Sequence, residues 1–204
     1  MSNQTGIQSA DKILVESTLA GNHQAFASII RQTEGLVSAI VYKMVTNAED
    51  RKDIAQDIYL KAYHKLSGFK FQCKLSTWIA QIAYNTCFSW LEKKKLVLPD
   101  PPRGESDAFD DPLELLSNPL TGVFAHREEL LVFEKQRARI IQAELEKLSP
   151  IYKTILSLFH QEEMSYAEIA AITGLPEGTL KSYLFRARKQ LKDNLLLNYK
   201  KDDL

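Results

Sequence analysis

Residues 162–191 read EEMSYAEIAAITGLPEGTLKSYLFRARKQL, and this segment carries start and stop signals for two consecutive helices. Ser165 and Glu168 have the spacing of a capping box, in which each side chain satisfies a backbone N–H of the other residue at the start of a helix. Gly174 suits the tight turn that ends this helix, and Pro176 suits the start of a second one. A short helix, a turn with glycine and a longer helix form the helix-turn-helix pattern, whose second helix lies in the major groove of DNA.

The second helix of this motif, expected over residues 176–194, carries charge of one sign. Between Gly178 and Lys192 the chain has five basic side chains and no acidic one, as contact with DNA phosphates requires. Apolar residues at helical spacing should pack inward, namely Leu180, Leu184, Ala187 and Leu191. The residues expected to contact DNA are Thr179, Lys181, Ser182, Tyr183, Arg186, Arg188 and Lys189. A merely solvated basic face is the alternative interpretation.

Helical periodicity also dominates upstream, and no strand-like alternation competes with it. Ser149 and Pro150 predict the start of a helix with Ile151, Ile155, Leu158 and Phe159 on its buried face. Earlier helices are expected at 11–19, 24–32, 36–45 and 48–66. A further helix, capped by Ser76 and ending near Lys95, should bury Trp78, Ile79, Ile82, Ala83, Cys87 and Trp90 or Leu91. The sequence therefore predicts an all-α fold.

An acidic segment divides the chain. Residues 96–135 contain five of the seven prolines, which interrupt helices repeatedly. The net charge is zero overall, but it is +4 over residues 1–95, −6 over residues 96–135 and +2 over residues 136–204. We therefore expect two small helical domains, residues 11–95 and 136–195, joined by an acidic, proline-rich linker. The linker is either a solvated spacer or a segment that occupies a channel of a partner.

Several classes of protein are excluded by what the sequence lacks. It has no apolar run long enough to span a membrane and no signal-peptide pattern, so we expect a cytoplasmic protein without membrane insertion. Cys73 and Cys87 have no metal-binding or disulfide spacing and should be core or near-surface thiols. The four histidines are scattered, and no catalytic motif is present. We therefore expect no enzyme activity, no catalytic residue, no cofactor and no metal.

The helix-turn-helix stretch resembles region 4 of bacterial sigma factors, particularly those of the extracytoplasmic-function (ECF) group. The resemblance rests on EIA at 168–170, GLPEGT at 174–179, KS at 181–182 and RARKQL at 186–191. The preceding LEKLSPIYKTILSLFH resembles the leading helix of that region. Three further stretches are similar, in order and spacing, to region 2 of the same family: GNHQAFASIIRQ at 21–32, AEDRKDIAQDIYLKAYHKL at 48–66 and FKFQCKLSTWIAQIAYNTCFSWLEKKK at 69–95.

The resemblance implies a protein that binds core RNA polymerase and delivers it to promoter DNA. Region 4 would read the upstream promoter element as duplex, although Tyr183 stands where the family commonly has arginine. The polymerase-binding helix would present Asp53, Gln56, Asp57 and Lys61. Region 2 would capture the downstream element as single strand through a loop at 69–75 and the helix after it, with Phe69, Lys70, Phe71, Lys74, Tyr84, Asn85, Lys93 and Lys94 as the candidate contacts.

Two points stay open in the sequence. Many members of the family are held inactive by an anti-sigma factor, and such a partner is compatible with this chain although no residue identifies one. A free-standing helix-turn-helix regulator that binds operators as a dimer would explain residues 149–194 equally well, but it leaves the N-terminal half unexplained.

Overall fold

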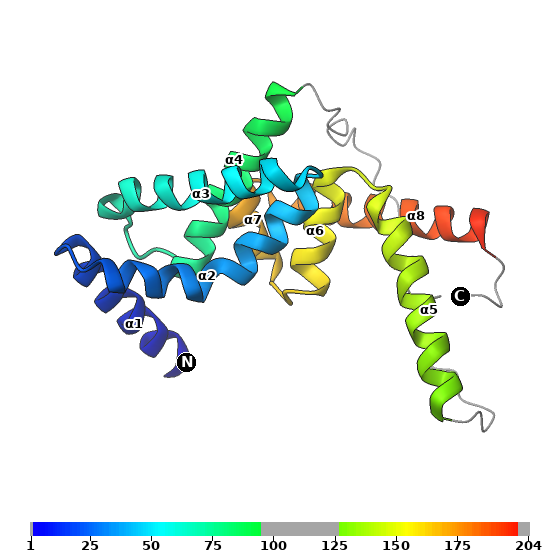
Figure 1. The fold of residues 1–204 in the computed structure, drawn as a ribbon, viewed down its shortest axis with the longest axis horizontal. Helices are drawn as coiled ribbons and strands as arrows, with labels where there is room; N and C mark the ends of the chain where they lie inside the picture. The colour runs from blue at the N-terminus through cyan, green and yellow to red at the C-terminus, as the bar shows by residue number, and fades with distance from the viewer. Residues whose placement is uncertain (1, 95–126, 200–204) are drawn as a thin grey trace.

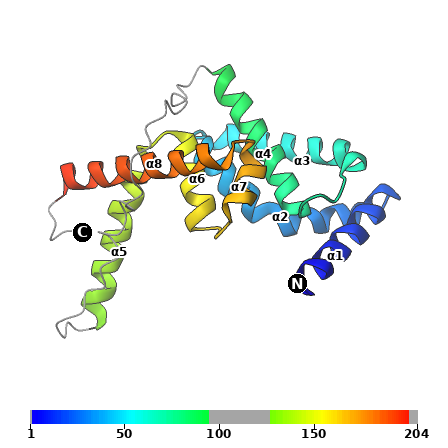
Figure 2. The same ribbon diagram turned by 180° about the vertical axis from the view of Figure 1, so that it is seen from behind.

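The structure, a computed structural model, describes residues 2–94 and 127–199, and every regular element in these two ranges is a helix (Figures 1 and 2). The elements are α1 (Ser2–Leu19), α2 (His23–Met44), α3 (Ala48–Lys65), the 3₁₀ helix η1 (Leu66–Gly68), α4 (Leu75–Lys93), α5 (Arg127–Glu146), α6 (Pro150–His160), α7 (Tyr166–Thr173) and α8 (Glu177–Asn198). The predicted all-α class is confirmed. No helix in the described ranges is both long and apolar enough to cross a membrane.

The N-lobe, residues 2–94, is built on helices that asparagine side chains start. Asn22 accepts the backbone N–H groups of Gln24 and Ala25, and Asn47 does the same at the start of α3. The two helices predicted at 24–32 and 36–45 are one continuous helix, α2, which passes through Gly35. A single glycine costs a helix only about 1 kcal/mol, and the buried face of α2 outweighs it. That face consists of Ala25, Ile29, Thr33, Val37, Ile40, Val41 and Met44.

Helix α4 starts earlier than the sequence suggested. Ser76 was expected to cap it, and this is wrong, because the helix begins at Leu75 and the capping position belongs to Lys74. Lys74 makes no side-chain cap of its own. Instead, the carboxylate of Asp11, on α1, accepts the backbone N–H of Leu75 at 2.9 Å. A residue 64 positions away in the sequence thus supplies the first polar contact of this helix.

The C-lobe, residues 127–199, contains the helix-turn-helix as predicted. Ser149 caps α6, and Ser165 with Glu168 forms a complete capping box at the start of α7. Gly174 ends α7 with a φ of 71°, in the left-handed region that favours glycine. Helix α5 already begins at Arg127, beyond the last linker proline, so the end of the expected linker is helical. The rest of the linker, up to residue 126, lies outside the described residues.

The two lobes lie against each other and share one hydrophobic core. Helix α6 packs on α2 and helix α7 packs on α4, while α1 and α5 extend away at opposite ends (Figures 1 and 2). Every residue from 151 to 158 in α6 is buried, including Lys153, whose ammonium group lies 3.1 Å from the carboxylate of Glu146. The sequence predicted two separate domains and gave no sign of this contact.

Candidate nucleic-acid interface

The second helix of the motif, α8, has the predicted division into two faces. Leu180, Leu184, Ala187 and Leu191 are buried. Lys181 and Lys189 are exposed, and four further candidates, Thr179, Ser182, Arg186 and Arg188, are half-buried. Aromatic rings orient two of the cations. The ammonium group of Lys181 lies 5.6 Å from the centre of the Tyr166 ring, and the guanidinium of Arg188 lies 5.2 Å from that of Phe159. The helix therefore presents a basic surface, and its buried face and these ring contacts set the orientation of that surface.

Tyr183 does not belong to that surface. Only 6% of it is exposed, and its ring packs edge-on against Tyr152 with 5.7 Å between the ring centres. Burial raises the pKa of its hydroxyl, and the neighbouring Tyr152 adds to this effect. In this conformation Tyr183 is a packing residue, and its sequence position among basic residues gave no hint of that.

Along the loop of residues 69–74, buried or half-buried side chains alternate with exposed ones. Phe69 is buried, with its ring centre 4.7 Å from that of Phe71 and 5.1 Å from that of Trp78. Phe71 has a φ of 56°, which is rare for a residue with a side chain. The exposed positions are Lys70, Gln72 and Lys74. The two lysines were predicted. Gln72 was not among the predicted contacts, and its exposure depends on the bent backbone at Phe71, which leaves no pattern in the sequence.

On helix α4 the candidate residues lie in different surroundings. Tyr84 is only 4% exposed, and burial together with the nearby Tyr183 raises its pKa to about 12. Asn85 and Lys93 are exposed. Lys94 is exposed as well, but its ammonium group lies 2.9 Å from the Asp50 carboxylate and 4.3 Å from the centre of the Trp90 ring. Trp78 and Trp90, both expected in the core, are half-buried.

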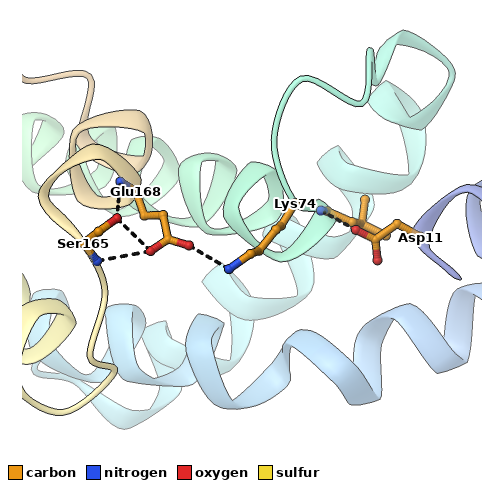
Figure 3. A network of polar contacts seen from close by, with 5 residues as sticks. Asp11, Lys74, Ser165 and Glu168 are labelled. Atoms are coloured by element: carbon orange, nitrogen blue, oxygen red, sulfur yellow. Dashed lines mark hydrogen bonds and ion pairs between the residues drawn. The ribbon is translucent and has the colours of Figure 1, made fainter. Parts of the chain in front are cut away.

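A polar network joins the 69–74 loop to the helix-turn-helix (Figure 3). The ammonium group of Lys74 lies 2.8 Å from one carboxylate oxygen of Glu168. The other oxygen accepts the backbone N–H and the hydroxyl of Ser165. The hydrogen bond from Lys74 is the largest cause that lowers the pKa of Glu168. Lys74 and Tyr84 of the N-lobe thus meet the C-lobe, so the structure is a closed arrangement of the two lobes.

Helix α3 presents a second candidate surface, which faces away from the N-lobe core. Asp53, Gln56 and Asp57 are exposed, opposite the buried Ile54, Ile58 and Ala62. Lys61 is half-buried, 2.7 Å from Asp57 and within 3.4 Å of the Thr86 hydroxyl. Two apolar side chains are exposed on the same helix, Leu60 at 52% and Tyr63 at 38%. Exposed apolar and aromatic side chains beside a polar rim suit a protein-binding surface, and the sequence had predicted only the polar part of this one.

No group of His, Cys, Asp and Glu residues within the described ranges could hold a metal ion. Cys87 is buried, and burial raises the pKa of its thiol to about 12, which keeps it protonated and unreactive at neutral pH. Cys73 is half-buried, and burial raises the pKa of its thiol too.

Comparison with known families and proteins gives matches over both lobes. The model of Sigma-70 region 2 matches residues 29–97, and that of Sigma-70, region 4 matches residues 138–191. The chain is 30% identical over 182 residues to the ECF RNA polymerase sigma factor SigW of Bacillus subtilis, covering 89% of this chain and 94% of that protein. It is 29% identical over 195 residues to the ECF RNA polymerase sigma-E factor of Escherichia coli K12, covering 92% and 95%.

Two solved structures share the fold. CnrH, in complex with the cytosolic domain of CnrY, superposes with a TM-score of 0.61 at 20% identity, covering 93% of this chain and 99% of that one. The sigma factor RpoE of Bartonella quintana, in complex with the anti-sigma factor NepR, gives a TM-score of 0.56 at 22% identity, covering 85% and 98%.

Proposed function

Because the chain belongs to the ECF RNA polymerase sigma factors, we propose that it binds core RNA polymerase and directs it to specific promoters. The observation that carries this function is the match of both regions, in order, along nearly the whole of SigW. The polymerase performs the chemistry, and this chain supplies the choice of sequence without catalysing a reaction. Since its partners are bacterial polymerase and promoter DNA, it acts in the cytoplasm.

Two domains contact different parts of the promoter. Residues 11–95 form region 2, residues 136–195 form region 4, and the acidic linker of residues 96–135 connects them. Region 4 reads the upstream promoter element as duplex, with α8 in the major groove. The exposed Lys181 and Lys189 supply cationic contacts, and the half-buried Thr179 and Ser182 lie near the helix start, where base edges are reached.

Region 2 captures the downstream element as single strand. Lys70, Gln72 and Lys74 stand exposed on the 69–74 loop, where two cations and one amide suit a phosphate backbone and a base edge. Extruding a base costs a few kcal/mol, which stacking at about 1–3 kcal/mol per base can offset. Phe71 is the half-buried aromatic residue of the loop, whereas Phe69 and Tyr84 must leave their packing before they can stack on a base.

The polymerase is bound through α3. Asp53, Gln56 and Asp57 form the polar part of this surface. Leu60 and Tyr63 add exposed apolar area that binding would remove from water. An anti-sigma factor is a further proposed partner, since the solved neighbour RpoE was determined in complex with one.

In vitro transcription with purified core polymerase tests the function. Genomic fragments are transcribed with the chain, with the core polymerase alone, and with a chain carrying Asp53→Ala and Gln56→Ala. We expect defined transcripts only when both proteins are present, and a weaker signal from the double variant because of lost polymerase affinity. A chain that fails to co-elute with the polymerase yet binds DNA as a dimer is an operator-binding regulator, and that result overturns the proposal.

A further inference from the structure

Helix α1 lies outside the matched region 2, which begins at residue 29, yet it contacts η1 and the first residue of α4, which flank the loop that is proposed to capture the downstream element. The contact is made by Asp11, whose carboxylate accepts the backbone N–H of Leu75 at 2.9 Å (Figure 3). Leu75 is the first residue of α4 and directly follows the 69–74 loop. Asp11 therefore acts where the loop ends and the helix begins.

The peptide bond between Lys74 and Leu75 is held from both sides. Its N–H donates to Asp11, and its carbonyl accepts the backbone N–H of Trp78 at 3.1 Å. The side chain of Lys74 makes no cap, and the side chain of Asp11 supplies the acceptor for this N–H instead. A carboxylate at this place also meets the positive end of the α4 dipole. The contact therefore fixes the direction in which the chain leaves the loop.

The other end of the loop is held by its own neighbours. The backbone N–H of Phe69 donates to the carbonyl of Leu66 at 3.1 Å, and its ring packs against Phe71 and Trp78. Each of these contacts spans fewer than ten positions along the sequence, whereas Asp11 is 64 positions from Leu75. Because both ends of the loop are fixed, its backbone is held in the one arrangement that exposes Lys70, Gln72 and Lys74.

We propose that Asp11 is a positioning residue for promoter recognition, which holds the 69–74 loop in the register that presents these three side chains to the downstream element. This inference rests on the proposed function. Asp11 touches no DNA itself and acts through the Leu75 amide. The negative charge of Asp11 would repel DNA phosphates. Its role near this surface is therefore to accept the hydrogen bond from the Leu75 N–H.

Selection from randomised DNA tests the inference. The chain with core polymerase is incubated with duplexes randomised across the promoter, and the bound molecules are sequenced. The wild-type chain defines the preferred upstream and downstream elements. For Asp11→Ala we expect the preference at the downstream element to fall about fivefold, as the loss of one cap allows, with the upstream preference and the affinity for polymerase unchanged. Asp11→Asn should restore the preference, because its side-chain carbonyl accepts the same N–H.

The matched control is Glu16→Ala, on the same helix, where the carboxylate is exposed and lies 3.8 Å from Lys12. It should behave as wild type. The inference is overturned if Asp11→Ala keeps the downstream preference, if it lowers both preferences and polymerase affinity together, or if Asp11→Asn is as impaired as Asp11→Ala. A wild-type chain that selects no sequence with the polymerase overturns the proposed function, and this inference with it.

Discussion

At the scale of single residues, Glu168 takes part in two structures at once. It completes the capping box that starts α7, and it receives the ammonium group of Lys74 from the other lobe. Both contacts favour the ionised carboxylate, and they lower its pKa although partial burial opposes them. A residue that the sequence identified only as a helix cap is therefore also a contact between the lobes.

We expect Lys74→Met to raise the pKa of Glu168 towards its ordinary value, because it removes the largest cause of the lowering. A carboxylate with a lowered pKa stabilises the fold above its ordinary pKa and loses this contribution as the pH falls through the folded pKa. The variant should thus lose less stability on acidification. A carbon-detected NMR titration of the carboxyl group measures the shift. Lys70→Met is the control from the same loop, and an unchanged Glu168 pKa in Lys74→Met would contradict the assignment.

The candidate DNA contacts on α8 should differ in what they contribute to binding. Arg186→Ala is expected to weaken binding across all promoters and to lower the slope of log affinity against log salt by about one, as loss of a phosphate contact does. Thr179→Ala and Lys181→Ala should instead change the preferred bases of the upstream element, by about 1–3 kcal/mol per base pair. Binding to a promoter panel at several salt concentrations separates the two outcomes. Equal effects of both classes on every promoter would argue against this division.

At the scale of helices, replacement of two glycines should change the free energy of unfolding in opposite directions. Gly174 ends α7 with a φ of 71°, whereas Gly35 lies inside α2. A Cβ would meet nothing within 4 Å at either position, so only the backbone conformation distinguishes them. Gly174→Ala should lower the free energy of unfolding by about 1 kcal/mol, because alanine is strained in the left-handed region.

Gly35→Ala is the matched substitution and should raise the free energy of unfolding by about 0.5–1 kcal/mol, since alanine loses less backbone freedom in a helix. Urea denaturation of both variants measures the two changes. Effects of the same sign would show that backbone conformation does not decide the outcome at these positions.

The sequence predicted those helix ends whose signals are local. Ser149, Ser165 and Gly174 act on backbone groups within a few residues of themselves, so their types and spacing were sufficient. The predicted start of α4 was wrong because Asp11 contacts it from another helix. The buried Tyr183 was assigned to the DNA surface because Tyr152, which packs on it, lies far away in the sequence. Contacts of this range leave no periodic pattern.

At the scale of the whole molecule, the closed arrangement conflicts with DNA binding. Tyr84, from the proposed downstream-element surface, is buried, and Lys74 is occupied by Glu168. A single strand cannot reach these side chains while the lobes stay packed. The lobes are therefore expected to separate when the chain joins the polymerase at a promoter.

A zero-length carbodiimide cross-link tests this separation. Carbodiimide treatment of the free chain should join Lys74 and Glu168, 2.8 Å apart, through an amide bond detected by peptide mass spectrometry, whereas the same treatment of the polymerase complex should not. The control is the pair of Lys12 and Glu16, which lie 3.8 Å apart on α1 and should cross-link in both states. Equal yields for Lys74 and Glu168 in the two states would show that the lobes stay together.

Helix α6 makes such a separation expensive for the isolated chain. Its residues 151–158 are covered on every side, in part by α2 of the other lobe. Separating the lobes in water would expose the apolar surface of this helix to solvent, at a cost of roughly 25 cal/mol for each Å² uncovered. The exposed surface would also favour self-association. The chain without a bound partner should therefore keep its lobes together. Only a partner that covers a comparable area of apolar surface can hold them apart.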